Sequence, residues 1–234
     1  MQQPTAPLLI FAAGFGARMG ALTANRPKPL VHVAGRPLID HALDVAEKAG
    51  ILRPVINLHY LADQLVAHLK GRNVEFSHER DQILETGGGL KAALPLLGDG
   101  PVLTLNSDGV WMGQNPLLQL LAAWDAARMD ALLLLLPIAQ AAGHGPKSDF
   151  ILSEDGRIAR ANGASGHAFI GASMINPACL AAIPDPVFSL NRPWDLIIAA
   201  GRAFGLEHQG DWCDVGTPDG IATAETLLHA WPHA

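Results

Sequence analysis

Short apolar runs alternate along this chain with segments whose apolar residues recur at helical spacing. The runs of strand length are residues 8–13, 54–58, 74–77, 101–105 and 131–137. Most lack polar alternation, as strands buried on both faces of a sheet do. The segments with helical spacing are residues 37–49, 62–69, 90–97 and 115–129. This alternation predicts an α/β fold, Rossmann-like, with a mixed but mainly parallel sheet and helices on both faces.

The last third of the chain adds a hairpin and two further helices to this pattern. Asp155-Gly156 is a strong turn signal and predicts a hairpin over residues 150–161. Residues 194–204 and 217–228 are expected to be packing helices. We expect one domain over residues 1–234, since a chain of this length can bury a sizeable core.

Composition narrows the class of protein. With 22 acidic against 16 basic side chains the net charge is −6, which disfavours a nucleic-acid partner. Cys179 and Cys213 form no disulfide framework and are expected to be reduced thiols. No basic region precedes the first apolar run, so a signal peptide is not expected. The longest apolar run, residues 131–136, is too short to span a bilayer. These features predict a cytoplasmic protein with no membrane partner.

The loop after the first predicted strand contains residue types that are typical of a phosphate-binding site. Gly14 and Gly16 allow positive φ and bring bare N–H groups close to an anion, and Arg18 can fork onto phosphate oxygens. Lys28 lies between two prolines, which are expected to hold it extended. A Walker A loop is excluded, since no Gly-Lys-Ser/Thr follows Gly14, and a dinucleotide fingerprint fits poorly because Met19 replaces its third glycine.

These residues resemble the signature of the sugar-1-phosphate nucleotidylyltransferases. The chain keeps Ala12, Ala13, Gly14, Gly16, Arg18, Met19, Leu22, Thr23, Pro27, Lys28, Pro29 and Leu30, and it departs at Ala21, where the family usually has proline. The resemblance implies the nucleotide-diphospho-sugar transferase fold, with a nucleotide-binding half over about residues 1–110 and a sugar-binding half over about 111–234. It also implies transfer of a nucleoside monophosphate from an NTP to a sugar 1-phosphate.

The resemblance assigns roles to the nucleotide half. Lys28 and Arg18 would be catalytic, and the nucleotide would contact Ala12, Ala13, Gly14, Gly16, Arg18, Lys28, Glu85, Gly88 and Asn106. The three glycines at 87–89 suggest a closely approaching ligand. Glu85 replaces a glycine common in relatives; its carboxylate could accept hydrogens from uracil or guanine, or it could simply face a helix dipole.

Two aspartates are expected to hold Mg²⁺. Asp108 follows a buried strand at its carboxyl end, where open α/β sheets place ligands, and Asp214 lies in a Trp-Cys-Asp-Val-Gly-Thr-Pro stretch that resembles a family motif. Mg²⁺ usually takes one or two carboxylates together with substrate phosphates. Thr217-Pro218 also fits the start of the last helix, as N-cap and first residue.

The sugar phosphate is expected to meet Lys147, Asp149 and Gly171. Relatives commonly present the lysine of a Glu-Lys-Pro tripeptide, which this chain lacks, so Lys147 is either its substitute or an ordinary solvated lysine. Gly171 lies in a strand that resembles the one lining the family's sugar site, where a small residue admits a pyranose.

Within the family, the chain looks most like the enzymes that use UTP and N-acetylmuramate 1-phosphate in peptidoglycan recycling. The Glu-Thr-Gly-Gly-Gly sequence at residues 85–89 and the Gly-His-Gly loop before Asp149 carry that likeness. The alternatives are a mannose-1-phosphate guanylyltransferase using GTP, a nucleotide-binding regulatory protein without turnover, and, least favoured, an oxidoreductase. The oligomeric state, monomer or small homo-oligomer, stays open.

Overall fold

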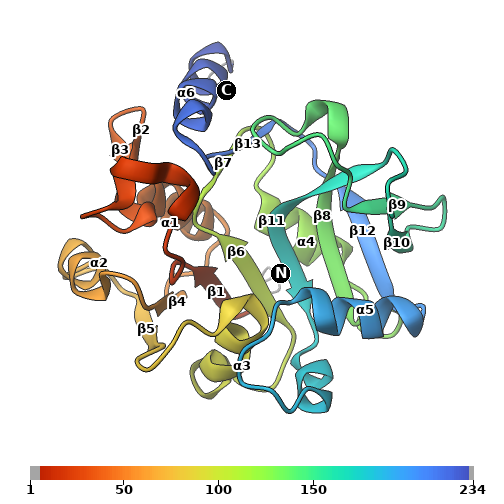
Figure 1. The fold of residues 1–234 in the computed structure, drawn as a ribbon. Coiled ribbons are helices and arrows are strands. Elements are labelled where there is room, and N and C mark those ends of the chain that lie inside the picture. The colour runs from red at the N-terminus through yellow and green to blue at the C-terminus, as the bar shows by residue number, and fades with distance from the viewer. Residues whose placement is uncertain (1–5, 232–234) are drawn as a thin grey trace.

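The computed structural model describes residues 6–231, and within this range a central sheet of nine strands forms the middle layer (Figure 1). Its strands are β1 (Leu8–Phe11), β4 (Val55–Leu58), β5 (Glu75–His78), β6 (Val102–Asn106), β8 (Ala131–Pro137), β9 (Phe150–Leu152), β10 (Ile158–Arg160), β11 (His167–Ile175) and β12 (Ala203–Glu207). The α-helices of this range are α1 (Leu38–Lys48), α2 (Ala62–His68), α3 (Glu85–Leu97), α4 (Pro116–Ala123), α5 (Asn191–Ala199) and α6 (Pro218–Ala230).

The two halves of the chain build the sheet differently. Strands β5, β4, β1 and β6 lie side by side and parallel. Strand β11 then runs antiparallel to both β6 and β8, and β12 is parallel to β8. The predicted hairpin is β9 with β10, and it joins the start of β11. The expected mixed, mainly parallel sheet is confirmed.

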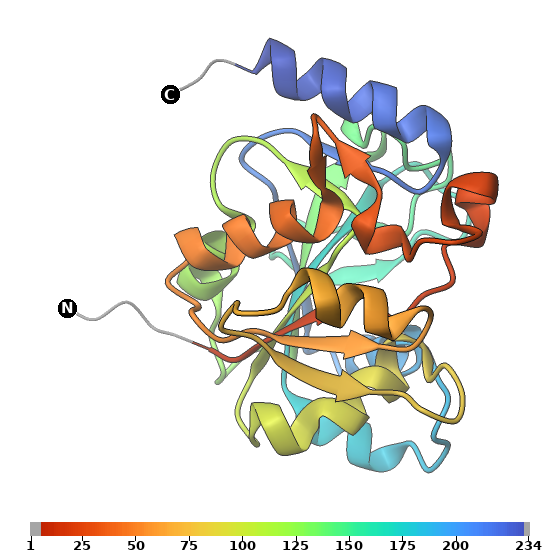
Figure 2. The same cartoon turned by 90° about the vertical axis from the view of Figure 1, so that its left-hand side faces the viewer.

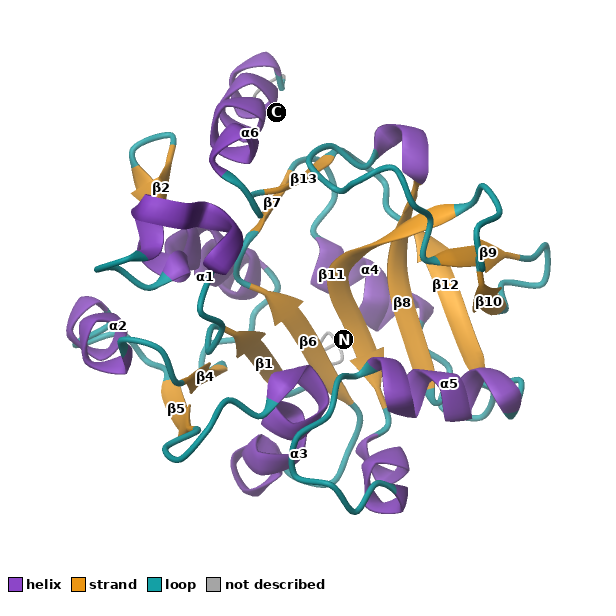
Figure 3. Ribbon diagram, viewed as in Figure 1, coloured by secondary structure: helices purple, strands orange, loops and turns teal. Residues whose placement is uncertain are grey.

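Successive residues of the buried strands point to opposite faces of the sheet, and each face has its own core. Leu8 and Ile10 pack among apolar residues of α1, α2 and α4, whereas Leu9 between them packs with residues of α3 and α5. Figure 3 shows α5 crossing in front of the sheet and α4 behind it. Helices cover both faces, as predicted, which is why the strand sequences are continuously apolar.

Two small sheets lie beside the central one. The hairpin of β2 (His32–Val33) and β3 (Arg36–Pro37) lies beneath α6, and Glu225 of that helix accepts a hydrogen bond from the Ala34 N–H (Figure 2). Strand β7 (Gly109–Trp111) pairs antiparallel with β13 (Trp212–Asp214). This second pairing joins residues about a hundred positions apart in the chain and brings the predicted metal aspartates together.

Several predicted helix boundaries are wrong. The helix expected at residues 115–129 ends at Ala123, and the one expected at 194–204 is α5 followed by strand β12. Thr217 occupies the N-cap position of α6 and Pro218 opens that helix, but no side-chain capping hydrogen bond forms. Residues 1–5, which bear on the expected absence of a signal peptide, lie outside the described residues. No helix among residues 6–231 combines the length and apolar character needed to cross a membrane.

The three consecutive glycines lie inside α3, and the chain itself packs against them. A Cβ at Gly87 would collide with the Phe188 ring, and one at Gly88 with the backbone carbonyl of Pro186. The Phe188 carbonyl accepts hydrogen bonds from the N–H groups of both glycines, each at 2.9 Å. The close approach that the sequence suggested for a ligand at Gly88 is therefore made by the segment 186–188.

This packing predicts that Gly88→Ala destabilises the fold. Alanine favours a helix interior by about 1 kcal/mol over glycine, but overlap with backbone cannot be relieved by a rotamer change. We expect a net loss of about 1–3 kcal/mol in the free energy of unfolding, measured by urea denaturation. Gly100→Ala is the matched control, because a Cβ at that position would have no neighbouring atom within 4 Å. Equal or greater stability of Gly88→Ala would contradict the packing.

Candidate active site

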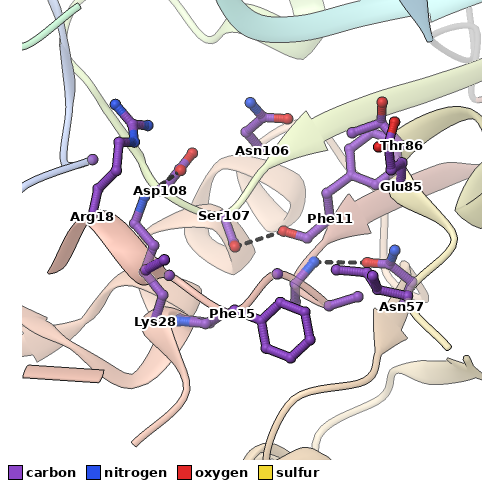
Figure 4. Close-up of a pocket in the computed structure, with 18 of the residues that line it drawn as sticks. Phe11, Phe15, Arg18, Lys28, Asn57, Glu85, Thr86, Asn106, Ser107 and Asp108 are labelled. Atoms are coloured by element: carbon purple, nitrogen blue, oxygen red, sulfur yellow. Dashed lines mark hydrogen bonds and ion pairs between the residues drawn. The ribbon is translucent and has the colours of Figure 1, made fainter. Parts of the chain in front are cut away.

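A cavity of about 460 Å³ opens at the carboxyl ends of β1, β4 and β6 (Figure 4). Open α/β sheets bind ligands at this edge. Nine of the predicted site residues line the cavity: Ala12, Ala13, Gly14, Gly16, Arg18, Lys28, Glu85, Asn106 and Asp108. The structure thus brings together the two segments that the sequence marked most strongly, the glycine loop and the end of the predicted strand at residues 101–105.

The glycine loop is fixed at both ends. Where β1 stops, the Ala12 N–H donates to Asn57 Oδ1 at 2.7 Å. Gly16 has φ +64°, and a Cβ there would lie 2.9 Å from Lys28 Cβ, so this position needs glycine for conformation and for space. Gly14 does not share the positive φ that the sequence suggested, and open space surrounds its Cα. The residues of this loop line the cavity, where backbone N–H groups could bind an anion.

Lys28 is held rigidly, although not in the extended form that its flanking prolines predicted. It opens a short 3₁₀ turn, η2 (Lys28–Leu30), in which the Leu30 N–H donates to Pro27 O at 2.9 Å. Its side chain is only 12% exposed, and Nζ lies 2.5 Å from Asp108 Oδ2. The turn and the ion pair hold the ammonium at the floor of the cavity.

Asp108 and Asp214 face each other because β7 pairs with β13. Asp214 lies opposite Gly109 in this ladder, and the Val215 N–H donates to the Asp108 carbonyl at 2.9 Å. Gly109 admits the pairing, since a Cβ there would lie 2.5 Å from Trp212 Nε1. Asp214 does not line the cavity itself; its Oδ2 lies 3.6 Å from Nη2 of Arg18, which does.

The cations around Asp108 and Asp214 do not fully neutralise these two carboxylates. Burial raises the pKa of Asp214 above its ordinary value, and the neighbouring Asp108 charge raises it further. The cations Lys28, Arg18 and His144 act in the opposite direction without cancelling the shift. Two facing carboxylates that are incompletely neutralised, one of them mostly buried, form a place where an added cation is stabilised.

The donor set fits a hard divalent cation that shares its coordination with substrate. Carboxylate oxygens are the ligands Mg²⁺ prefers. No group of three or more His, Cys, Asp or Glu side chains among residues 6–231 is arranged to enclose a metal ion. Asp108 and Asp214 would therefore supply only part of a coordination sphere, which is how Mg²⁺ is held in phosphoryl-transfer sites that leave room for phosphates and water.

Sequence reasoning missed a buried network beneath the cavity. Asn57 receives the Ala12 N–H and donates through Nδ2 to Glu79 Oε1 at 2.7 Å, while Glu79 Oε2 accepts the Leu84 N–H at 2.7 Å. Burial raises the pKa of Glu79 despite these two hydrogen bonds. Both side chains line the cavity and lie at or just beyond strand carboxyl ends, the signal that could have found them. The network ties the glycine loop to the turn before α3.

Glu85 lies on the cavity wall in a strained backbone conformation. It is the first residue of α3 and has φ +59°, a value that suits glycine far better than glutamate. This conformation explains why a glycine at this position would be natural. The carboxylate is exposed and lines the cavity while also lying at a helix N-terminus, so both interpretations offered by the sequence describe its position.

The residues expected at the sugar phosphate are not gathered in this cavity. Lys147 is exposed and forms no ion pair with the described residues. Gly171 has φ +81° at an irregularity in β11. A Cβ at Gly171 would lie 3.0 Å from Asn106 Cβ, so this part of β11 packs closely against the end of β6. Asp149 forms an ion pair with His144, whose Nε2 lies 3.1 Å from Asp149 Oδ2.

The sequence marked Asp149 and the loop that carries His144, but it did not predict that the two side chains form an ion pair. The hydrogen bond to Asp149 raises the pKa of His144, although burial of the ring opposes the shift. Burial in turn opposes ionisation of Asp149, but His144 and the Phe169 N–H outweigh it and hold the pKa of Asp149 below its ordinary value. The pair thus favours the protonated form of His144 beside the carboxylate of Asp149.

Comparison with known proteins agrees with the motifs. The family described as a MobA-like NTP transferase domain matches residues 8–145. N-acetylmuramate alpha-1-phosphate uridylyltransferase of Caulobacter vibrioides is 40% identical over 97% of this chain and 99% of its own length. The Neisseria meningitidis protein of the same name is 34% identical over 95% and 98%. Mannose-1-phosphate guanyltransferase beta-B of Xenopus laevis is 27% identical over 92% of this chain and 62% of its own.

The fold has close neighbours among solved structures. HddC from Yersinia pseudotuberculosis, complexed with GMP-PN, superposes with a TM-score of 0.76 at 19% identity, covering 96% of this chain and 100% of that one. A putative glucose-1-phosphate thymidylyltransferase from Bacillus anthracis gives 0.76 at 17% identity, covering 98% of each chain. These confirm the nucleotide-diphospho-sugar transferase fold. The chain therefore belongs to the MobA-like NTP transferase family and, together with the two uridylyltransferases, to the sugar-1-phosphate nucleotidylyltransferases that its motifs resemble.

Proposed function

We propose that the protein transfers UMP from UTP to N-acetylmuramate 1-phosphate, giving the UDP-sugar and pyrophosphate. The observation that carries the proposal is the charge cluster beside the glycine loop: Lys28 pairs with Asp108, and Arg18 lies near Asp214. The choice of UTP and of this sugar is supported by two relatives of that name whose whole lengths match this chain. The reaction belongs to peptidoglycan recycling in the cytoplasm, a reducing compartment that suits the unpaired Cys179 and Cys213.

The chain would divide this work between its halves. Residues up to about 110 form the cavity for the nucleotide, and residues from about 111 onward supply the acceptor side, including Gly171 and the loop before Asp149. A phosphate oxygen of the acceptor forms a bond to the α-phosphorus of UTP while the bond to the bridging oxygen breaks and pyrophosphate leaves. Since the nucleophile is already an anion, the barrier is mainly repulsion between two polyanions.

The cations of the site would reduce that repulsion by neutralising phosphate charge. Lys28 would leave Asp108 and stabilise charge on the α-phosphate, a role suited to an ammonium on a rigid turn. Arg18 is 66% exposed at the cavity mouth and would fork onto the β- and γ-phosphates beside the N–H groups of the glycine loop. Asp108 and Asp214 would hold Mg²⁺, which supplies charge neutralisation between the two phosphates when bound.

A second candidate, transfer of GMP to mannose 1-phosphate, is favoured by one feature of the site. The Glu85 carboxylate on the cavity wall could accept hydrogens from N1 and N2 of guanine as readily as the single imide hydrogen of uracil. Retention of Lys28, Asp108 and Asp214 in one cluster argues against a regulatory protein without turnover.

The experiment that tests the proposal is pyrophosphate release with Mg²⁺ across UTP, GTP, CTP, ATP and dTTP, each paired with four sugar 1-phosphates. The acceptors are the 1-phosphates of N-acetylmuramate, N-acetylglucosamine, glucose and mannose. We expect the highest kcat/KM with UTP and the muramate sugar. A maximum with GTP and mannose 1-phosphate would move the protein to the second candidate, and no release with any pair would refute both.

Replacing Lys28 tests its place at the α-phosphate. Lys28→Ala should lower kcat by roughly 10²–10³-fold, the loss typical of one preorganised group that stabilises transition-state charge. The control is Lys70→Ala, at an exposed lysine just beyond α2 that should leave kcat unchanged. Near-normal kcat in Lys28→Ala would remove this lysine from the catalytic scheme.

Replacing Asp214 tests the metal assignment. Asp214→Asn removes one of the two carboxylate charges, so the Mg²⁺ concentration that gives half-maximal turnover should rise. Loss of a residue that only supports a metal ligand typically costs roughly 10–100-fold in metal affinity, and we expect loss of a ligand to cost at least as much. Asp99→Asn, at an exposed aspartate before β6, is the control. An unchanged Mg²⁺ titration of Asp214→Asn would exclude Asp214 as a ligand.

A further inference from the structure

The acceptor side of the proposed reaction lacks a named cation. Arg18 and Lys28 both line the nucleotide cavity, and the scheme above places both on the phosphates of UTP. A sugar 1-phosphate that approaches Asp108 and Asp214 would share the proposed Mg²⁺ with UTP, so a side-chain cation on the acceptor side would add to the neutralisation of its charge. Lys147 is exposed and stands apart from the described charge pairs. We propose that His144, held by Asp149, binds an anionic oxygen of the acceptor sugar phosphate. This inference rests on the proposed function, since it concerns one of that reaction's substrates.

The backbone of the loop fixes His144 beside Asp214. The Asp214 N–H donates to the Ala142 carbonyl at 2.9 Å, and Ala142 forms a bridge with Cys213. Gly143 has φ +74°, and a Cβ there would overlap the Asp214 carbonyl. The loop therefore follows the β13 backbone in direct contact. His144, the next residue, cannot move away from the metal carboxylate without breaking this pairing.

The ring of His144 is held from the opposite side by β11. Asp149 Oδ2 lies 3.1 Å from His144 Nε2 and also accepts the Phe169 N–H at 2.8 Å. The Asp149 N–H donates to the His167 carbonyl at 2.8 Å. Asp149 is thus tied to the strand that carries Gly171 at its irregular stretch. His144 spans the gap between the two strands that would flank an acceptor, β11 and β13, and its ring centroid lies 6.4 Å from that of Trp212.

When the His144 ring is protonated, it keeps one N–H that a ligand can take. Nε2 is committed to Asp149, whereas Nδ1 makes only a 3.3 Å contact to the carbonyl of the adjacent Gly145, on the exposed side of the loop. The side chain is 24% exposed. An anionic oxygen accepts a hydrogen bond from a cation more strongly than a neutral carbonyl at that distance does. Exchange of Gly145 O for a phosphate or carboxylate oxygen would therefore be favourable.

The alternative is that the pair only fastens the loop to β11. The chain offers a comparison for that role, because His68 Nε2 lies at the same 3.1 Å from Asp40 Oδ1, away from the cavity. A purely structural pair at 144 and 149 should behave like the pair at 68 and 40 when its histidine is replaced. A substrate contact should instead change one kinetic constant selectively.

The test is steady-state kinetics of His144→Asn with His68→Asn as control. Loss of a hydrogen bond to a charged group should raise the KM for the sugar phosphate by roughly 10–100-fold, with the KM for UTP and the thermal midpoint little changed. His68→Asn should leave both KM values as in the wild type. If His144→Asn leaves the acceptor KM unchanged, or raises the KM for UTP equally, the proposal is overturned.

The choice of acceptor identifies which anion is bound. N-acetylglucosamine 1-phosphate carries the phosphate but lacks the lactyl carboxylate of the muramate sugar. A similar rise in KM for both acceptors assigns His144 to the phosphate. A rise confined to N-acetylmuramate 1-phosphate assigns it to the lactyl carboxylate and makes His144 a determinant of sugar specificity.

A direct binding measurement keeps this inference separate from the proposed function. If the wild type is active and His144→Asn has the same acceptor KM, the function stands and the inference fails. If the wild type releases no pyrophosphate with any pair, the function fails, and the inference is decided by ¹⁵N NMR of the histidine rings during titration with each sugar 1-phosphate. A shift of the resonance that His144→Asn lacks supports it, and an unmoved resonance overturns it. Where the variant does not fold, the His144 resonance is assigned in the wild type by correlation to its own backbone, and the same titration decides the inference.

Discussion

The repulsion between Asp108 and Asp214 is the constraint on which the rest of the site depends. The two carboxylates are brought together by the pairing of β7 with β13, and burial makes their mutual charge costly. Lys28 pairs directly with Asp108, and Arg18 lies near Asp214. These two ion pairs keep both cations beside the cavity before a phosphate binds. Substrate binding can then exchange one set of charge pairs for another without a large rearrangement.

The fold supplies what that exchange requires. Parallel strands β4, β1 and β6 end at one edge, so Asn57, the glycine loop and Asn106 meet around a single cavity. The antiparallel strand β11 then continues the sheet toward the acceptor side. The loop after β8 returns to β13 and carries His144 with it. In the proposed reaction, the nucleotide and the sugar phosphate would be bound on either side of the same pair of carboxylates.

The sequence predicts most of the fold because its strands are apolar enough to be recognised without alternation. It also locates Lys28, Asp108 and the glycine loop, because the short motifs around them contain the residue types that a phosphate site needs. It fails where distant segments decide the outcome. Residues 203–204, the end of a predicted helix, instead begin strand β12, which is parallel to β8. The glycines of α3 suggest a ligand, yet the segment 186–188 fills the space beside Gly87 and Gly88. Glu79 and His144 gain importance only through partners far along the chain or through a loop docked on β13.

The most direct measurement of the central claim is a crystal structure with Mg²⁺ and a non-hydrolysable UTP analogue. The account predicts electron density for an ion bound by the carboxylates of both Asp108 and Asp214. It also predicts that Lys28 Nζ has left Asp108 for an oxygen of the α-phosphate. An ion bound away from these two carboxylates, with the Lys28–Asp108 pair intact beside the bound nucleotide, would contradict it.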